Sequence, residues 1–156
     1  QRQMCIRDSY QSQAQALGIE SDLCLLVEPD LDELLPDFCL ILSNLLENSL
    51  EALAREGGGW LRARCTSSGG GYISLVVANS SATHLRRING RYLSSKRGIR
   101  FGTGLSTVQG IVRRRGGRAE FTADGQQFRA SIFLPCSSPK DSPVCASSPR
   151  GDTPLK

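Results

Sequence analysis

A long helix candidate with a polar stripe constrains the fold of this chain more than any other feature. Apolar residues at helical spacing cover most of the circumference of residues 37–55, which end before three consecutive glycines. Polar residues recur at i, i+4, i+7 and i+11 and share one face: Asn44, Asn48, Glu51 and Arg55. Periodicity alone favours a solvated face. Asparagine is a poor helix former, so two asparagines on one helix face need another explanation. Beside carboxylates, they indicate a coordinating role such as oxygen ligation of Mg²⁺.

The rest of the chain interleaves helical segments with strand pairs. The expected elements are a helix-compatible segment at 10–17, strands at 23–27, 60–66 and 72–79, a glycine-opened helix at 104–115, and a hairpin of 118–124 with 127–134. The polar stretch 80–100 between them is expected to be a loop. Helices interleaved with antiparallel hairpins predict an α+β fold with two layers, a sheet and its helices.

Composition excludes several classes of protein. Hydrophobic residues make up 39% and charged residues 22%, which is too apolar for a chain disordered throughout. No apolar stretch approaches the roughly 18–20 residues of a membrane span. The net charge is +4, and residues 10–136 hold 14 basic and 12 acidic residues, so we expect no nucleic-acid or membrane contact. Six cysteines without a Cys-x-x-Cys pair favour a reducing, cytoplasmic location.

Both ends of the chain read differently from its middle. The chain does not begin with Met, and residues 4–9 resemble a translated sequencing adapter, so residues 1–9 are expected to be a non-native leader on a protein truncated upstream. Residues 137–156 hold five serines and four prolines and are expected to be a disordered tail. The working domain is therefore expected at residues 10–136.

The helix at 37–55 carries a family motif. Asn44-Leu-Leu-Glu-Asn48-Ser-Leu-Glu-Ala52 resembles the N box of the GHKL ATPases, which include DNA gyrase, a heat-shock chaperone, a mismatch-repair ATPase and the histidine kinases. The preceding Asp37-Phe-Cys-Leu-Ile-Leu-Ser resembles sensor histidine kinases of the peptide quorum-sensing type. The resemblance implies the GHKL sandwich with a mixed sheet and helices on one face. It also implies that Asn48 holds the Mg²⁺ that bridges the ATP phosphates.

The resemblance also implies catalytic roles within this helix. Gyrase-like members place a water-activating glutamate at the position of Asn44, and an asparagine cannot accept a proton there, which fits a kinase better than a hydrolase. Glu47 is the nearer candidate for a base. Many histidine kinases carry a cation at the position of Glu51, so the phosphate charge must be met by other residues here.

A glycine pair opens the helix at 104–115. Glycines at a helix N-terminus let backbone N–H groups approach a phosphate, although glycines also commonly begin helices after loops. About fifty residues after the N box, Gly102, Gly104 and Leu105 resemble the second glycine box of the family and are implied to bind nucleotide.

A basic stretch precedes that glycine pair. Arginines 86, 87, 91 and 100 surround a Ser-Ser-Lys segment that ordinary surface cations would explain equally well. The segment resembles the ATP lid of the quorum-sensing subgroup, so Lys96 and Ser95 are implied to contact ATP. His84, the chain's single histidine, is interpreted as a surface residue.

The first glycine box of the family is altered here. Most relatives have Asp-x-Gly-x-Gly after the strand, and the aspartate accepts a hydrogen bond from the adenine amino group. Asn79 stands at that position and no glycine follows in residues 80–81. Its side-chain carbonyl still accepts a hydrogen bond, but not a charge-assisted one, so adenine binding is expected to be weaker.

Together the motifs predict the catalytic ATP-binding domain of a sensor histidine kinase. The implied cofactors are ATP and Mg²⁺, and the implied partners are a histidine-bearing dimerisation helix upstream and, indirectly, a response regulator. The parent protein is expected to be a membrane-anchored homodimer. Two alternatives stay open: a GHKL serine-kinase anti-sigma factor, and an interaction module whose catalysis has decayed.

Overall fold

The structure is a computed structural model that describes residues 2–26, 33–68, 71–82, 85–88, 91–94 and 103–136. Its elements, in chain order, are α1 Arg2–Ala16, β1 Glu20–Leu25, α2 Leu35–Glu56, β2 Trp60–Ser68, β3 Tyr72–Ser80, β4 Leu85–Ile88, β5 Arg91–Ser94, α3 Thr103–Arg114, β6 Arg118–Ala123 and β7 Gln127–Pro135. The long helix, the strands β2 and β3 and the hairpin of β6 with β7 therefore lie where the sequence predicts them. In this part of the chain, no helix is long and apolar enough to cross a membrane.

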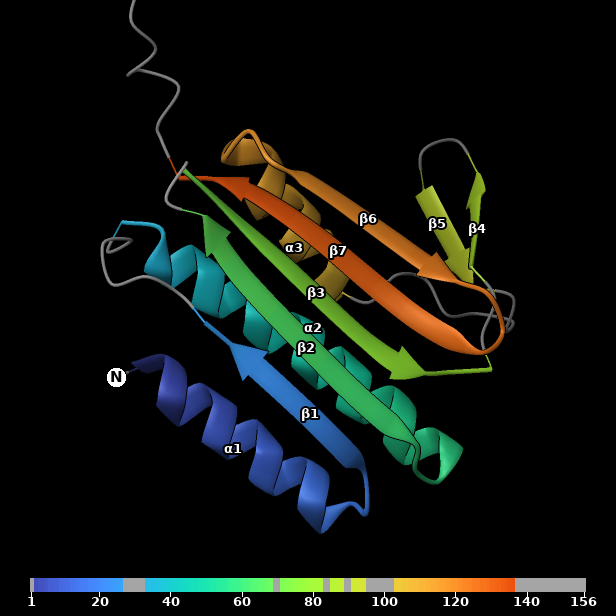
Figure 1. Ribbon diagram of the computed structural model, residues 1–156. Helices are drawn as coiled ribbons and strands as arrows, with labels where there is room; N and C mark the ends of the chain where they lie inside the picture. The colour runs from blue at the N-terminus through green and yellow to red at the C-terminus, as the bar shows by residue number, and fades with distance from the viewer. Residues whose placement is uncertain are drawn as a thin grey trace, which may run out of the picture.

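Five strands form one mixed sheet in the order β1-β2-β3-β7-β6. β1 pairs in parallel with β2, and the other neighbours pair antiparallel. Helices α2 and α3 lie against one face of this sheet, and α1 lies beside β1 at its edge (Figure 1). The predicted two-layer α+β sandwich is confirmed. One expectation was wrong: the polar stretch 80–100 holds a two-stranded hairpin of β4 and β5, because hydrogen bonding across a short ladder does not require apolar alternation.

The core lies between the helices and the sheet. α2 begins with a proline in its first turn and ends at Gly57, whose φ of 81° suits a left-handed helix cap. One face of α2 is buried: Phe38, Ile41, Leu42, Leu45, Leu46, Ser49, Leu50 and Leu53. Each fully buried leucine contributes about 1.5–3 kcal/mol relative to exposure, so this face anchors α2 firmly to the sheet.

Burial also controls the thiols of the sheet. Cys65 on β2 is 1% exposed, and burial raises its pKa to about 12. A thiol protonated to that degree at neutral pH is a weak nucleophile and a poor metal ligand. Cys65 therefore acts as a small apolar residue of the core.

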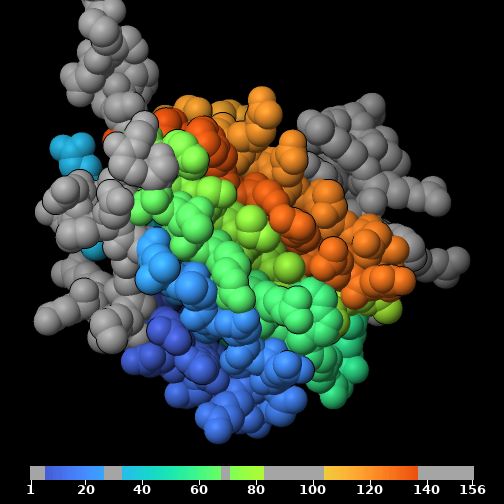
Figure 2. Space-filling model, viewed as in Figure 1, coloured from blue at the N-terminus to red at the C-terminus, as the bar shows by residue number. Residues whose placement is uncertain are grey.

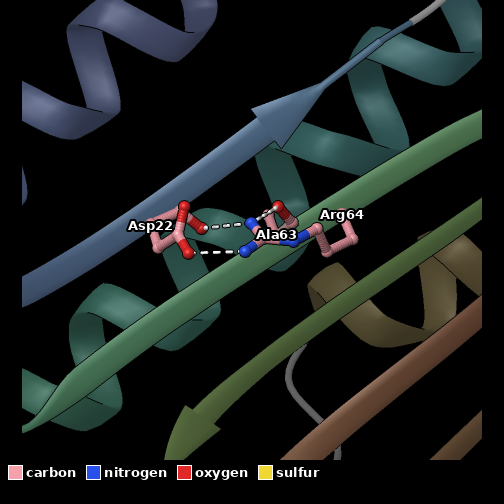
Figure 3. A network of polar contacts seen from close by, with 3 residues as sticks. All are labelled: Asp22, Ala63 and Arg64. Atoms are coloured by element: carbon pink, nitrogen blue, oxygen red, sulfur yellow. Dashed lines mark hydrogen bonds and ion pairs between the residues drawn. The ribbon is translucent and has the colours of Figure 1, made fainter.

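No helix or strand that the structure describes covers the other face of the sheet, and Figure 2 shows the strands of the sheet running across it. Tyr72 and Phe133 pair on this face with ring centroids 5.1 Å apart. The Arg62 guanidinium lies 5.1 Å from the centroid of the Trp60 ring. Figure 3 shows Arg64 of β2 bound to Asp22 of β1, and this hydrogen bond lowers the pKa of the Asp22 carboxyl. The contact between Arg64 and Asp22 joins β1 to β2, and the pair of Tyr72 with Phe133 joins β3 to β7.

Candidate functional site

The C-terminal half of α2 runs beside the end of β3, in the same direction as that strand (Figure 1). The Ala82 backbone N–H donates to Glu56 Oε1 at 3.2 Å, just beyond the end of the strand. Leu53 and Ser80 meet at Gly59, where a Cβ would lie 2.8 Å from Leu53 Cδ2 and would collide with Ser80 Oγ. Only a residue without a side chain permits this approach.

Asn79 points from β3 into the space between sheet and helices. It is 1% exposed, and its Nδ2 donates to the Ser80 carbonyl at 2.9 Å. Its Oδ1 is buried and has no hydrogen-bond partner. Leu61 of β2 and Phe128 of β7 pair with Asn79 in the sheet and give this oxygen apolar neighbours on both sides. An acceptor left unsatisfied in such surroundings costs about 1–3 kcal/mol, which a ligand that donates to it would recover.

Asn44 and the start of α3 come together at the other end of the site. A Cβ on Gly104 would lie 3.1 Å from Asn44 Oδ1, so the missing side chain lets the first turn of α3 approach α2. The Asn44 amide is oriented because Nδ2 donates to the Leu40 carbonyl at 2.8 Å. The structure thus brings together a residue of the predicted N box and one of the predicted second glycine box.

The polar stripe of α2 divides into two parts. Asn44 and Asn48 are partly buried, whereas Glu51 and Arg55 are exposed. The solvated-face interpretation therefore describes the C-terminal part of the stripe. Asn48 makes no side-chain hydrogen bond with any residue the structure describes, so its amide oxygen is available to a ligand.

Glu47 is bound from outside α2. The Tyr10 hydroxyl of α1 donates to Glu47 Oε1 at 3.0 Å, and Tyr10 is 8% exposed. Burial raises the pKa of Tyr10, a hydrogen bond with Ser43 opposes this rise, and the Glu47 carboxylate adds to it. Sequence analysis missed this contact because 37 residues separate its partners.

An ion pair fixes α2 against α3. Arg115 Nε donates to Asp37 Oδ2 at 2.7 Å, and Arg115 Nη2 donates to the Glu33 carbonyl at 3.1 Å. These bonds join the start of α2 to the residue after α3. They limit sliding of one helix along the other and so hold Gly104 beside Asn44.

Of the remaining predicted site residues, the structure describes one and leaves three outside the described residues. Leu105 is 6% exposed and packs in the core. Ser95, Lys96 and Gly102 lie outside the described residues. One buried polar residue of α2 was overlooked: Ser49, whose hydroxyl is fully buried. Its position among the leucines of the apolar face was the available signal.

Comparison with known proteins identifies the class. Residues 35–138 match the family model described as histidine kinase-, DNA gyrase B- and HSP90-like ATPase, and the chain belongs to that family. It is therefore a GHKL ATP-binding domain. A search of curated protein sequences finds no match.

Solved structures of histidine kinases share the fold. The blue-light activated histidine kinase of Erythrobacter litoralis EL346 matches with a TM-score of 0.65 at 17% identity, over 84% of this chain and 40% of that kinase. The mycobacterial sensor histidine kinase MprB matches with a TM-score of 0.57 at 17% identity, over 86% of this chain and 95% of that one. Full-length ShkA in complex with AMPPNP matches with a TM-score of 0.59 at 17% identity, over 86% and 30%.

The described residues fit a nucleotide of this family. The buried, unpartnered Oδ1 of Asn79 could accept a hydrogen bond from the amino group of a planar base, and the apolar side chains beside Asn79 could pack against that base. Among the described residues, no three histidine, cysteine or carboxylate side chains cluster as metal ligands. Mg²⁺ commonly takes few oxygen ligands from protein side chains and the remainder from phosphate and water, and the amide oxygen of Asn48 is a ligand of that kind.

Proposed function

We propose that this domain is the catalytic part of a sensor histidine kinase of the peptide quorum-sensing type. It would transfer the γ-phosphoryl group of ATP to a histidine on a dimerisation helix of the parent protein. The bond from the γ-phosphorus to the bridging oxygen breaks, a bond to the histidine nitrogen forms, and ADP leaves. A response regulator would then receive the phosphoryl group, and the parent would be a membrane-anchored homodimer.

One observation carries the proposal: the buried, unpartnered Oδ1 of Asn79. In this role Asn79 accepts a hydrogen bond from the adenine amino group. Asn48 holds Mg²⁺, which when bound neutralises phosphate charge and orients the γ-phosphoryl group. The first turn of α3 at Gly104, with Gly102 and Leu105, receives the phosphates, and Ser95 and Lys96 supply the lid.

Catalysis of this kind depends on positioning and charge neutralisation. Asn44, oriented by its bond to the Leu40 carbonyl, lines the phosphate side of the site. Glu47 is the candidate base, and Tyr10 holds its carboxylate. An asparagine at position 44 cannot activate water, which favours transfer to a histidine over ATP hydrolysis.

Thermal unfolding with and without Mg·ATP tests nucleotide binding. A ligand at a hundredfold excess over its Kd stabilises the native state by about 2.7 kcal/mol, so even weak binding raises Tm. We expect Asn48→Ala to abolish the dependence on Mg²⁺ and Asn79→Leu to abolish the shift. Ser74→Ala, on the same strand but the opposite face, is the control and keeps the full shift.

Phosphotransfer needs a second assay. The chain is incubated with labelled ATP and a purified histidine-bearing dimerisation domain, and acid-labile, alkali-stable phosphate is measured on that domain. Wild-type protein that binds ATP yet labels no histidine would contradict the kinase assignment. Absence of any Tm shift at millimolar Mg·ATP would instead favour the interaction module.

A further inference from the structure

Ser49 is a second buried polar side chain that finds no partner. It lies on the apolar face of α2 with 0% exposure, and its hydroxyl has no hydrogen-bond partner. Serines inside helices commonly donate back to the carbonyl four residues earlier, but Ser49 does not. A buried hydroxyl that bonds neither to protein nor to water costs free energy. A ligand that bonds to this hydroxyl would recover that cost.

The packing of α2 on β3 shows where Ser49 lies. The side chains of Leu53 and Ser80 both lie next to the Cα of Gly59. Leu53 of α2 and Ser80 of β3 are therefore at the same height along the direction in which the helix and the strand run. Ser49 lies one turn earlier, about 6 Å back along the helix axis. At about 3.3 Å per strand residue, that displacement reaches the level of residues 77–79.

The inward-pointing residues at that level are Val77 and Asn79, both buried. The two buried side-chain atoms without partners, Ser49 Oγ and Asn79 Oδ1, therefore lie at the same level of the space between α2 and the sheet, on the buried sides of their elements. Leu61 and Phe128 bound this space on the sheet side, beside Asn79. The space thus offers two polar contacts in apolar surroundings.

The chemistry of the two atoms is complementary. Asn79 Oδ1 is an acceptor, and the Nδ2 donor of the same side chain is already bound to the Ser80 carbonyl, whereas a serine hydroxyl donates as well as accepts. The edge of a 6-aminopurine presents a donor, the amino group, next to an acceptor, the ring nitrogen N1. The edge of a 6-oxopurine presents the reverse order, with an acceptor opposite the Asn79 oxygen.

We infer that Ser49 is a specificity-determining residue of the nucleotide site, whose hydroxyl donates to N1 of the adenine ring while Asn79 accepts from the neighbouring amino group. This inference rests on the proposed function, since it requires that the site holds ATP. It assigns to the centre of α2 the selection of the base. Asn44 and Asn48 then serve the phosphates.

The test compares ligands as well as variants. Dissociation constants of ATP, 1-deaza-ATP and 7-deaza-ATP are measured by calorimetry for wild type, Ser49→Ala and the outer-face control Ser74→Ala. Replacing N1 by C–H removes the acceptor that Ser49 would use, whereas 7-deaza-ATP keeps it. We expect 1-deaza-ATP to bind wild type about three- to tenfold more weakly than ATP.

Ser49→Ala is expected to weaken ATP and 7-deaza-ATP by the same factor and to leave 1-deaza-ATP unchanged. Its Tm without nucleotide should equal or exceed that of wild type, whereas a structural serine would lower it. Equal affinities for ATP and 1-deaza-ATP in wild type would overturn the inference without any variant. A wild type that binds none of the three nucleotides would overturn the proposed function itself.

Discussion

The polar residues of α2 meet different surroundings at the two ends of the candidate site. At the buried end, Ser49 and Asn79 are closed off from water and retain unpartnered oxygens. At the open end, Asn44, Asn48 and Gly104 are partly exposed, and the Asn44 amide is already bound to the helix backbone. An unpartnered buried atom points to a ligand more strongly than an exposed one, because water satisfies the latter.

The buried end should also be the less tolerant of change, and Gly59→Ala tests this most severely. Gly59 has a φ of 135°, and an added Cβ would collide with Ser80 Oγ and crowd Leu53. We expect a loss of about 3–4 kcal/mol in the free energy of unfolding, measured by urea denaturation.

Gly58→Ala is the matched control for that variant. Gly58 has a φ of 126°, but a Cβ there meets nothing within 4 Å. The free energy of unfolding of Gly58→Ala should fall only by the cost of backbone strain, about 1–2 kcal/mol. Equal losses in the two variants would show that the packing beside Gly59 relaxes freely, and the contrast between the two ends would disappear.

The open end is probed by two glycines of α3. Gly110 has open space around it, so Gly110→Ala should stabilise the protein by up to about 1 kcal/mol through helix propensity. Gly104→Ala brings a methyl group to 3.1 Å from Asn44 Oδ1, and its unfolding free energy should stay within about 0.5 kcal/mol of wild type. Urea denaturation measures both variants. An equal rise in the free energy of unfolding for Gly104→Ala and Gly110→Ala would show that the Asn44 side chain moves aside without an energetic cost.

A further test concerns the outer flank of the open end. Tyr10→Phe removes the bond to Glu47 and should cost about 0.5–1.5 kcal/mol at pH 7. Because folding raises the pKa of Tyr10, the native state holds this proton more tightly than the unfolded state. The stabilisation is therefore complete below pH ~10 and is lost as pH rises through the raised pKa.

Thermal unfolding of wild type and Tyr10→Phe from pH 7 to 11 measures that loss, with Tyr72→Phe on the outer face as the control. The difference in Tm between wild type and Tyr10→Phe should narrow above pH ~10. A difference that stays constant over this range would mean that the contact with Glu47 does not depend on the Tyr10 proton.

Local patterns predicted most of the fold. The helix around Asn44 and the hairpin closed at Asp124 follow from periodicity and turn residues, which act over a few positions. The parallel pairing of β1 with β2 joins residues about 40 positions apart, such as Glu20 and Trp60, and no local pattern encodes it. The β4–β5 hairpin was missed because its residues lack alternation.

The candidate site was predictable only where a motif marked it. Asn44, Asn48 and Asn79 stand out because asparagine is unusual in a helix interior or strand. Ser49 gave a weaker signal, since serine is small enough to pass as a core residue. Tyr10 gave none, because its partner lies on another helix.

The position of Trp60 has a spectroscopic consequence. It is the chain's single tryptophan, and its backbone N–H donates to Ser80 Oγ at 3.0 Å, one residue from Asn79. Its ring lies near the Arg62 guanidinium, a charge that shifts indole emission when the distance between them changes. We therefore expect a ligand bound at Asn79 to change the emission of Trp60 through Ser80, so that titrations can be followed optically without a label.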